Sequence, residues 1–154
     1  MTTDELLEQL ENASVLSIES SDKCIIDPET REISIPETYQ LLGVESDEKV
    51  ERIEFQCPKI VGDNIDLSQL QIRVNYQNAN GDKDQYIVED VETNGDNIEF
   101  SWLLSRKVTQ YRGTVQFIVC AVKVSDDATI TNEWNTTLAQ AEVLQGLEVD
   151  TPEP

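Results

Sequence analysis

The sequence predicts an all-β protein: an immunoglobulin-like antiparallel β-sandwich with a short N-terminal helix. First, short runs in which apolar and polar residues alternate recur along the chain, and clusters of Asn, Asp, Gly, Ser and Pro separate them. Second, one longer apolar run lies late in the sequence. Third, only one segment has the spacing of an amphipathic helix. This pattern is typical of two packed sheets with Greek-key connections. The Cys–Trp–Cys framework of antibody domains is missing, so the prediction concerns the architecture alone.

The N-terminal helix is predicted over residues 2–13. Thr2 and Glu5 have the spacing of a capping box. The apolar side of the helix carries three leucines: Leu6, Leu7 and Leu10. A helix this short is marginal in water by itself. Its leucines therefore either pack on the core of this domain or pair with another protein chain, or the helix stays frayed. We interpret residues 1–22 as a helical arm and the three leucines as a candidate assembly interface, with a homo-oligomer as one form of that assembly.

Two short strand-like runs follow at residues 24–27 and 32–35, and a turn that begins at Pro28 joins them into a predicted hairpin. Pro36 ends the second run because proline cannot donate a hydrogen bond to a neighbouring strand. The next segment, residues 37–42, suits a single helical turn that ends before a glycine.

Three regular alternations predict half-buried strands in the middle of the chain. Their apolar residues recur at every second position, as expected for strands with one face on the core. The inward rows are Ile53, Phe55 and Cys57, then Leu70, Ile72, Val74 and Tyr76, then Ile98, Phe100 and Trp102. Pro58 ends the first of these strands. The turn sequence at residues 78–82 leads into residues 86–91, which predicts a second hairpin.

The centre of the fold is predicted at residues 113–124. Within this segment only Gln116 and Lys123 interrupt an apolar run that is rich in β-branched residues and begins at Val115. Such a run indicates a strand that is buried on both faces. A helix is the alternative, but Gly113 before the run and the acidic turn after it suit the length of a strand better.

The segments around this central strand complete the predicted domain. Residues 103–112 are expected to cross between the sheets before it, and residues 129–143 are expected to form one long strand after it, partly at an edge. The β-sandwich domain is therefore predicted to span residues 23–148. Residues 149–154 are predicted to form a disordered tail.

The net charge of −20, from 31 acidic and 11 basic residues, is the strongest feature of the composition. Such a surface repels phosphate groups, and no Lys/Arg cluster offers the counterion release that drives nucleic-acid binding. Nucleic acid and anionic membranes are therefore excluded as direct partners. The acidity suits solubility, with specific use as a docking field as the alternative. The chain has no histidine, which removes the usual general base and the commonest metal ligand.

The three cysteines, Cys24, Cys57 and Cys120, are odd in number, far apart and set in apolar runs. This spacing suits neither a disulfide framework nor a zinc site, so we interpret them as buried free thiols in a reducing compartment. The first residues lack the basic and apolar regions of a secretion signal, and no run approaches the ~20 apolar residues of a membrane span. The protein is expected to be soluble in the cytoplasm in which it is made.

No catalytic, cofactor-binding or metal-binding residue is predicted. Oxygen-bearing side chains between Asn78 and Glu89 imitate the spacing of a calcium loop, but Lys83 occupies the position that needs glycine, which favours a solvated hairpin loop. Asp66 suits a cap for the short segment that follows it. Carboxylate pairs arise by chance among 31 acidic residues, and Ser101 has no histidine to activate it. An enzyme is therefore not expected.

Five segments together resemble a known family of structural proteins: IDPETREISIP (residues 26–36), NYQNANGD (75–82), FSWLL (100–104), VTQYRG (108–113) and TNEWN (131–135). The chain from residue 25 to residue 148 is similar to small structural proteins from tailed phages and prophages of Gram-positive bacteria. In layout it resembles the N-terminal domain of the siphophage baseplate upper protein. The tract from residue 101 to residue 113 and the strand and hairpin that follow it are the most specific part.

The resemblance implies a non-enzymatic tail or baseplate component that acts through protein–protein contacts in virion assembly or host adsorption. Its expected partners are other tail or baseplate proteins, its expected location is the tail of the virion after assembly in the bacterial cytoplasm, and no cofactor is implied. The alternative is a carbohydrate-binding or adhesion module of immunoglobulin-like fold, which needs two or three exposed aromatic residues on one face. The candidates for that role are Tyr39, Tyr76, Tyr86, Tyr111 and Trp134.

Overall fold

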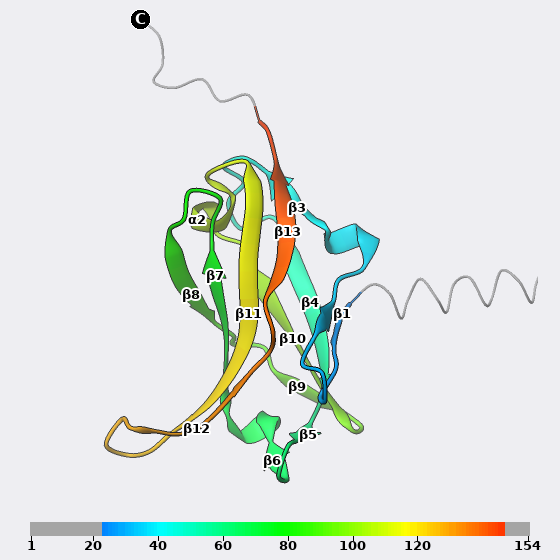
Figure 1. The fold of residues 1–154 in the computed structure, drawn as a ribbon, viewed down its shortest axis with the longest axis vertical. Helices are drawn as coiled ribbons and strands as arrows, with labels where there is room; N and C mark the ends of the chain where they lie inside the picture. Colours follow the sequence, from blue (N-terminus) through cyan, green and yellow to red (C-terminus); the bar gives the residue numbers. More distant parts are fainter. Residues whose placement is uncertain (1–22, 147–154) are drawn as a thin grey trace, which may run out of the picture.

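Two β-sheets pack face to face and enclose most of the buried apolar side chains (Figure 1). The computed structural model describes residues 23–146. Strands make up most of these residues and helical turns are few, so the predicted β-sandwich architecture is confirmed at this level. The predicted helical arm, with Leu6, Leu7 and Leu10, and the predicted tail lie outside the described residues.

Each sheet is built from strands that are distant in the sequence. The first sheet has the order β2 (Ile33–Ser34), β1 (Cys24–Ile26), β4 (Arg52–Pro58), β10 (Asn97–Leu103) and β9 (Glu92–Asn94). The second has the order β3 (Leu41–Val44), β13 (Ala139–Leu144), β11 (Gly113–Val124), β7 (Gln71–Gln77) and β8 (Lys83–Ile87), and β12 (Ile130–Asn135) also pairs with β11. A small third sheet joins β5 (Ile60–Val61) to β6 (Ile65–Asp66). Three short helical segments complete the set: η1 (Glu37–Tyr39), η2 (Leu67–Gln69) and α2 (Arg106–Thr109).

Both sheets are mixed, although the sequence predicted antiparallel pairing. Strand β1 runs parallel to β4, with Cys24 beside Phe55, and β3 runs parallel to β13, with Leu41 beside Glu142. The other strand pairs are antiparallel. The two parallel pairs could not be predicted from the alternation of apolar and polar residues. Alternation shows which side of a strand is buried and not which strand lies beside it.

The two predicted hairpins and the alternating strands are present, but the second strand of the second hairpin is β8, Lys83–Ile87, and not residues 86–91. Strands β1 and β2 pair around the turn after Ile26, and β7 pairs with β8 around the turn at residues 78–82. The inward rows on β4, β7 and β10 are buried, as predicted from their period of two. The predicted helical turn is present as η1, but the residues after it, Leu41–Val44, form strand β3 and carry Gly43 at a φ of +136°.

Strand β11 pairs along almost its whole length and lies at the centre of the second sheet. On one side it pairs with β7; on the other it pairs first with β13 and then with β12. The prediction of one long strand over residues 129–143 is therefore wrong, and β13 is not an edge strand because β3 covers its far side. The break between β12 and β13 lies at Thr136, whose Oγ1 accepts the N–H of Val119 at 2.9 Å while its own N–H donates to the Val119 carbonyl at 2.9 Å.

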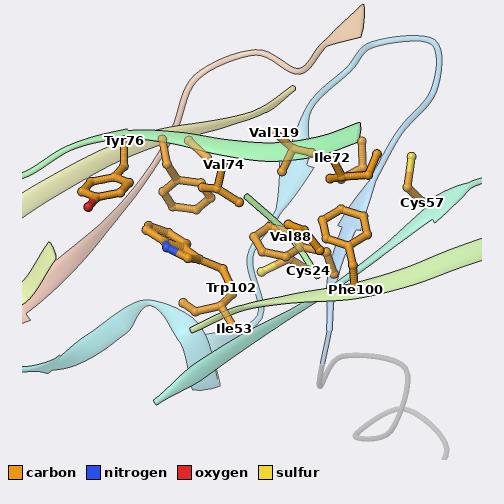
Figure 2. Close-up of a cluster of buried hydrophobic side chains, with 14 of the residues drawn as sticks. Cys24, Ile53, Cys57, Ile72, Val74, Tyr76, Val88, Phe100, Trp102 and Val119 are labelled. Carbon is orange, nitrogen blue, oxygen red and sulfur yellow. The ribbon is translucent and has the colours of Figure 1, made fainter. Parts of the chain in front are cut away.

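The core lies between the two sheets and is rich in aromatic contacts. Figure 2 shows Ile72, Val74, Tyr76 and Val119 of the second sheet opposite Trp102, Phe100 and Ile53 of the first. The rings of Phe55 and Phe100 are stacked with centroids 5.2 Å apart, and Trp102 is part of the core, as predicted. Cys24, Cys57 and Cys120 are free thiols and are buried, as predicted. No helix among residues 23–146 is long and apolar enough to cross a membrane.

Candidate interaction surface on the second sheet

The outward row of β11 is apolar over half of its length, which is unusual for a sheet face without a further layer on it. Cys120 and Val122 point outward, yet only 4% and 1% of their surfaces are exposed. Their cross-strand neighbours are long polar residues, Arg73 and Asn135 beside Cys120, and Gln71 and Glu133 beside Val122. The aliphatic stems of such side chains can cover apolar surface while their polar ends stay in water. Burial on both faces, as predicted for the whole strand, is therefore confirmed for residues 119–122 only.

Two side-chain hydrogen bonds hold this cover in place. Arg73 Nε donates to Gln71 Oε1 at 2.6 Å, and Asn135 Nδ2 donates to Glu133 Oε2 at 2.9 Å. The pKa of the Cys120 thiol is raised, mainly because burial disfavours the thiolate, with a smaller contribution from the charge of Glu133. The thiol is thus an inert apolar group on this face.

Exposed apolar side chains also occupy several other outward positions of the second sheet. The described residues include eleven large apolar side chains that are exposed. Six of them occupy outward positions of the second sheet or of β12: Leu41, Val44, Ile87, Val124, Ile130 and Leu144. A seventh, Leu138, is 62% exposed and lies beside Ile118, since it directly precedes Ala139, the partner of Phe117. On the outward positions of the first sheet only Ile25 belongs to this group.

The polar residues of this face are mostly amides. Gln77, Gln116 and Gln140 lie next to one another across β7, β11 and β13, and Asn75 lies beside Gln85 on the neighbouring row. An amide side chain both donates and accepts hydrogen bonds and carries no charge. These residues can therefore be desolvated by a partner at a lower free-energy cost than carboxylates.

The charges on this face cancel, in a molecule with a net charge of −20. Its outward strand positions carry Arg73 and Lys83 on one side of β11 and Glu133 and Glu142 on the other. By contrast, the face of the first sheet carries four carboxylates against two cations: Glu54, Asp90, Glu92 and Glu99 against Lys23 and Arg52. We call the outward side of β3, β13, β11, β7, β8 and β12, with Leu138, the acid-poor face.

A shallow hollow of about 610 Å³ lies in the middle of the acid-poor face. The outward side chains that line it are Asn75, Gln77, Lys83, Gln85, Gln116, Ile118 and Leu138. The Asn75 Oδ1 atom is buried and has no hydrogen-bond partner among the described residues. Buried acceptors are almost always paired, and leaving one unpaired costs about 1–3 kcal/mol.

The loop that imitates a calcium site is a hydrogen-bonded hairpin turn. Asn78 Oδ1 accepts the backbone N–H groups of Asn80 and Asp82 at 3.0 Å each, and its Nδ2 donates to the carbonyl of Lys107 at 2.9 Å. The side chain of Asn78 thus closes the turn and ties it to α2. Among residues 23–146, no three His, Cys, Asp or Glu side chains are placed to hold a metal ion.

A salt bridge reinforces the same junction. Lys107 Nζ lies 3.1 Å from Asp84 Oδ2. The pKa of Asp84 is lowered, first by the backbone N–H of Gln85 and then by Lys107, while Asp84 raises the pKa of Lys107. Both side chains are close to half-exposed, so solvent screening leaves the pair only a modest stabilising effect.

Ser101 is held in a network of hydrogen bonds. Its Oγ donates to Asp90 Oδ2 at 2.5 Å and accepts a hydrogen bond from Arg52 Nη1 at 2.8 Å, and its backbone N–H donates to Asp90 Oδ1 at 3.0 Å. Asp90 belongs to the connection between β8 and β9, so these bonds fasten that connection to β10. Asp66 caps η2, as predicted, by accepting the N–H of Ser68 at 2.9 Å.

The aromatic residues proposed for a carbohydrate site do not form an exposed platform in the described part of the chain. Tyr76 and Trp134 are buried, and Tyr39 and Tyr86 are half-buried against the core. Of the five candidates only Tyr111 is exposed. Trp134 lies under the guanidinium of Arg31, whose carbon is 5.3 Å from the ring centroid, so this contact fastens the turn after β1 to β12.

No protein-family model matches the chain, and a search of curated proteins finds no significant match. The acid-poor face was not predicted from the sequence, although its amides stand at the polar positions of the predicted strands. The signal that could have indicated it is the excess of Gln and Asn over Glu and Asp at those polar positions.

Proposed function

We propose that this chain is a non-enzymatic structural protein of a phage or prophage tail, and that it acts through protein–protein contacts in virion assembly or host adsorption. Its partners are other tail or baseplate proteins, and its location is the virion after assembly in the cytoplasm of the bacterial host. The proposal joins the sequence resemblance to the chemistry of the acid-poor face.

An immunoglobulin-like fold is part of the proposal, and the strand order supports it. The order β1-β4-β10-β9 corresponds to strands A, B, E and D of an immunoglobulin domain, and β13-β11-β7-β8 corresponds to G, F, C and C′. The parallel strand β3 then lies beside β13 at the outer end of the second sheet. The parallel pairing of β1 with β4 is a departure from that pattern.

The single observation that carries the function is the contrast between the two sheet faces. Depletion of charge distinguishes the centre of a protein–protein interface from the remaining surface. The acid-poor face has this property and holds seven of the eleven exposed large apolar side chains of the described residues, whereas the opposite face carries Glu54, Asp90, Glu92 and Glu99. A protein partner is the class of ligand that fits such a broad and shallow surface.

The competing function, a carbohydrate-binding or adhesion module, has less support. The amide-lined hollow could hydrogen-bond hydroxyl groups, but sugar rings also need aromatic faces to stack on. Tyr76 is buried next to the hollow, and Trp134 is buried under Arg31. This function would require a binding mode without aromatic stacking.

The test is whether the protein is a component of tail particles. In the bacterium that carries the gene, particles purified after prophage induction should contain the chain at a fixed ratio to tail proteins in quantitative mass spectrometry. The variant Leu138→Glu should be incorporated at least tenfold less, because it places a charge in the acid-poor face. Val50→Glu is the matched control, since Val50 is 66% exposed and lies outside that face. Absence of the chain from purified particles would refute the proposal.

A further inference from the structure

We infer that the acid-poor face binds the same face of a second copy of this chain, so that two acidic molecules pair where their charges are balanced. This inference rests on the proposed function, because it requires that the acid-poor face binds protein. The partner that it adds is a second copy of the chain. Four features of the face support it: its electrostatic balance, the placement of its charges, the position of Leu138 and its size.

Electrostatics first narrows the class of partner. A basic protein would be attracted to the surfaces rich in carboxylates, such as the one formed by Glu54, Glu92 and Glu99. The acid-poor face offers it no such attraction. An acidic partner is repelled by the carboxylate-rich surfaces and least repelled by the acid-poor face. Charges more than about 10 Å apart are largely screened, so the charges at the contact itself determine this repulsion. A second copy is an acidic molecule with a contact surface of zero net charge.

The placement of the charges then selects one two-fold arrangement. The cations Arg73 and Lys83 lie on the β7–β8 side of β11, and the anions Glu133 and Glu142 lie on the β12–β13 side. A two-fold axis parallel to β11 between two facing sheets places the β7–β8 side of each copy over the β12–β13 side of the other. Arg73 then faces the strand that carries Glu133 of the second copy, and Lys83 lies one strand, about 4.8 Å, to the side of Glu142 of the second copy. The same two contacts occur twice, as expected for an isologous interface.

The register of the strands agrees with this arrangement. Lys83 belongs to the same row as Gln77 and Gln116, and Glu142 lies beside Thr114, one outward position further along β11. The same offset of one position separates the row of Arg73 from the row of Glu133. An axis parallel to β11 preserves the position along the strand, so the opposite charges of the two copies lie about 7 Å apart along the strand direction. Long side chains can span that separation.

Leu138 and the hollow have complementary shapes in the same two-fold arrangement. Leu138 projects beside Ile118 on the β13 side of β11, and the far part of the hollow lies on the other side of β11, between Asn75 and Gln85 in the same row. The same two-fold axis places Leu138 of the second copy over that part of the hollow.

The size of the face is sufficient for a stable dimer. Its six strands hold 40 residues in all: 4 in β3, 6 in β13, 12 in β11, 7 in β7, 5 in β8 and 6 in β12. At about 4.8 Å per strand and about 3.4 Å per residue, these strands cover roughly 650 Å². Specific interfaces bury about 600–1,000 Å² on each partner, so the face reaches the lower end of that range.

A charge-swap experiment tests the pairing in the full chain. Sedimentation equilibrium of the wild-type protein should show a dimer. Lys83→Glu alone and Glu142→Lys alone should each raise the dissociation constant at least tenfold, because each places like charges opposite one another. An equimolar mixture of the two variants should form a heterodimer again, since both contacts then join opposite charges. The controls are Lys49→Glu and Glu48→Lys, which make the same changes at exposed positions before β4 and should leave the dissociation constant unchanged.

A second variant pair separates this surface from the helical arm. Leu138→Glu should weaken the dimer at least tenfold and Val50→Glu should not. Replacement of Leu6, Leu7 and Leu10 together by Ser should leave the dimer intact. A wild-type protein that is monomeric up to about 1 mM would overturn the inference, as would a dimer that withstands Leu138→Glu or that the leucine replacements abolish. A dimer that is absent from tail particles would refute the proposed function alone, and a monomer found in tail particles would refute this inference alone.

Discussion

The indole of Trp102 packs against the ring of Phe117, with centroids 5.2 Å apart and planes inclined by 55°. Trp102 belongs to β10 of the first sheet and Phe117 to β11 of the second, and each is 1% exposed. Such tilted aromatic pairs contribute beyond the area that they bury. This contact therefore joins the two layers at the centre of the core.

Phe117→Ala should lower the free energy of unfolding by about 3–5 kcal/mol, because it leaves a cavity between the sheets. Denaturant titration monitored by tryptophan fluorescence measures this loss, with Trp102 as the reporter next to the cavity. Glu54→Ala, at an exposed outward position of β4, is the control and should change stability by no more than about 0.5 kcal/mol. A loss below about 1 kcal/mol for Phe117→Ala would place the core elsewhere.

Asn78→Asp should lower the free energy of unfolding by about 2–3 kcal/mol, although the two side chains have nearly the same shape. The substitution replaces the Nδ2 donor with a carboxylate oxygen that faces the carbonyl of Lys107 and the carboxylate of Asp82. The control is Asn80→Asp, which adds the same charge near the same Asp82 carboxylate but at an exposed site. Equal losses for the two variants in urea titration would show that the buried hydrogen bonds of Asn78 contribute nothing.

The contribution of Asp27 to stability should disappear at low pH. Its pKa is lowered, first by the backbone N–H of Thr30 and then by that of Glu29, both of which donate to Oδ1. A carboxylate whose pKa is lowered in the folded state stabilises the protein above the ordinary carboxylate pKa of about 4, and this stabilisation is lost as the pH falls through the lowered value. In calorimetry, Asp27→Ala should lower the melting temperature at pH 6 and have a smaller effect near pH 2. Glu29→Ala is the control at pH 6, where it should change stability by no more than about 0.5 kcal/mol, because it keeps the backbone N–H that donates to Asp27.

The buried thiols should resist alkylation in the folded protein. Burial raises the pKa of Cys24 and of Cys57 to about 12, so at pH 8 only about one in 10,000 of each is a thiolate. Mass spectrometry after iodoacetamide treatment should show labelling of these two residues only when the chain is unfolded. Arg73→Ala should accelerate labelling of Cys120, because Arg73 lies beside that thiol on the acid-poor face. Labelling of Cys24 as fast as that of Cys120 in the folded variant would contradict this expectation.

The sequence was sufficient to place most of the strands, because the side of a strand that is buried is a local property. Ile53, Phe55 and Cys57 alternate with polar residues whatever strand lies beside them, and all three are buried in the first sheet. The turn at residues 78–82 was likewise predictable, since its Asn and Gly residues determine the backbone locally.

The order of the strands could not be predicted in the same way. Nothing near Leu41 indicates that its neighbour in the sheet is Glu142, because that pairing depends on the closure of the whole second sheet. The break between β12 and β13 depends on one side chain, Thr136, which takes a backbone hydrogen bond that a continuous strand would have made. Side chains that hydrogen-bond the backbone in this way cannot be recognised from the pattern of apolar and polar residues.

The acid-poor face was missed for a related reason. Gln77, Gln116 and Gln140 are separate polar positions in the sequence, and only the pairing of β7, β11 and β13 brings them together. Their lack of charge becomes significant when compared with the carboxylates on the opposite face. The candidate leucines of the helical arm, by contrast, were identified from the sequence and lie outside the described residues.

The parallel pairing of β3 with β13 also has a consequence for synthesis on the ribosome. Leu41 leaves the ribosome long before Glu142, its neighbour in the sheet. At roughly 5–20 residues per second, β3 waits roughly 5–20 s for its partner strand. During that interval Leu41 and Val44, both exposed even in the finished fold, are free to pair with the edge strands of other nascent chains. Chaperone capture of translation intermediates should therefore be strongest until residue 144 has emerged.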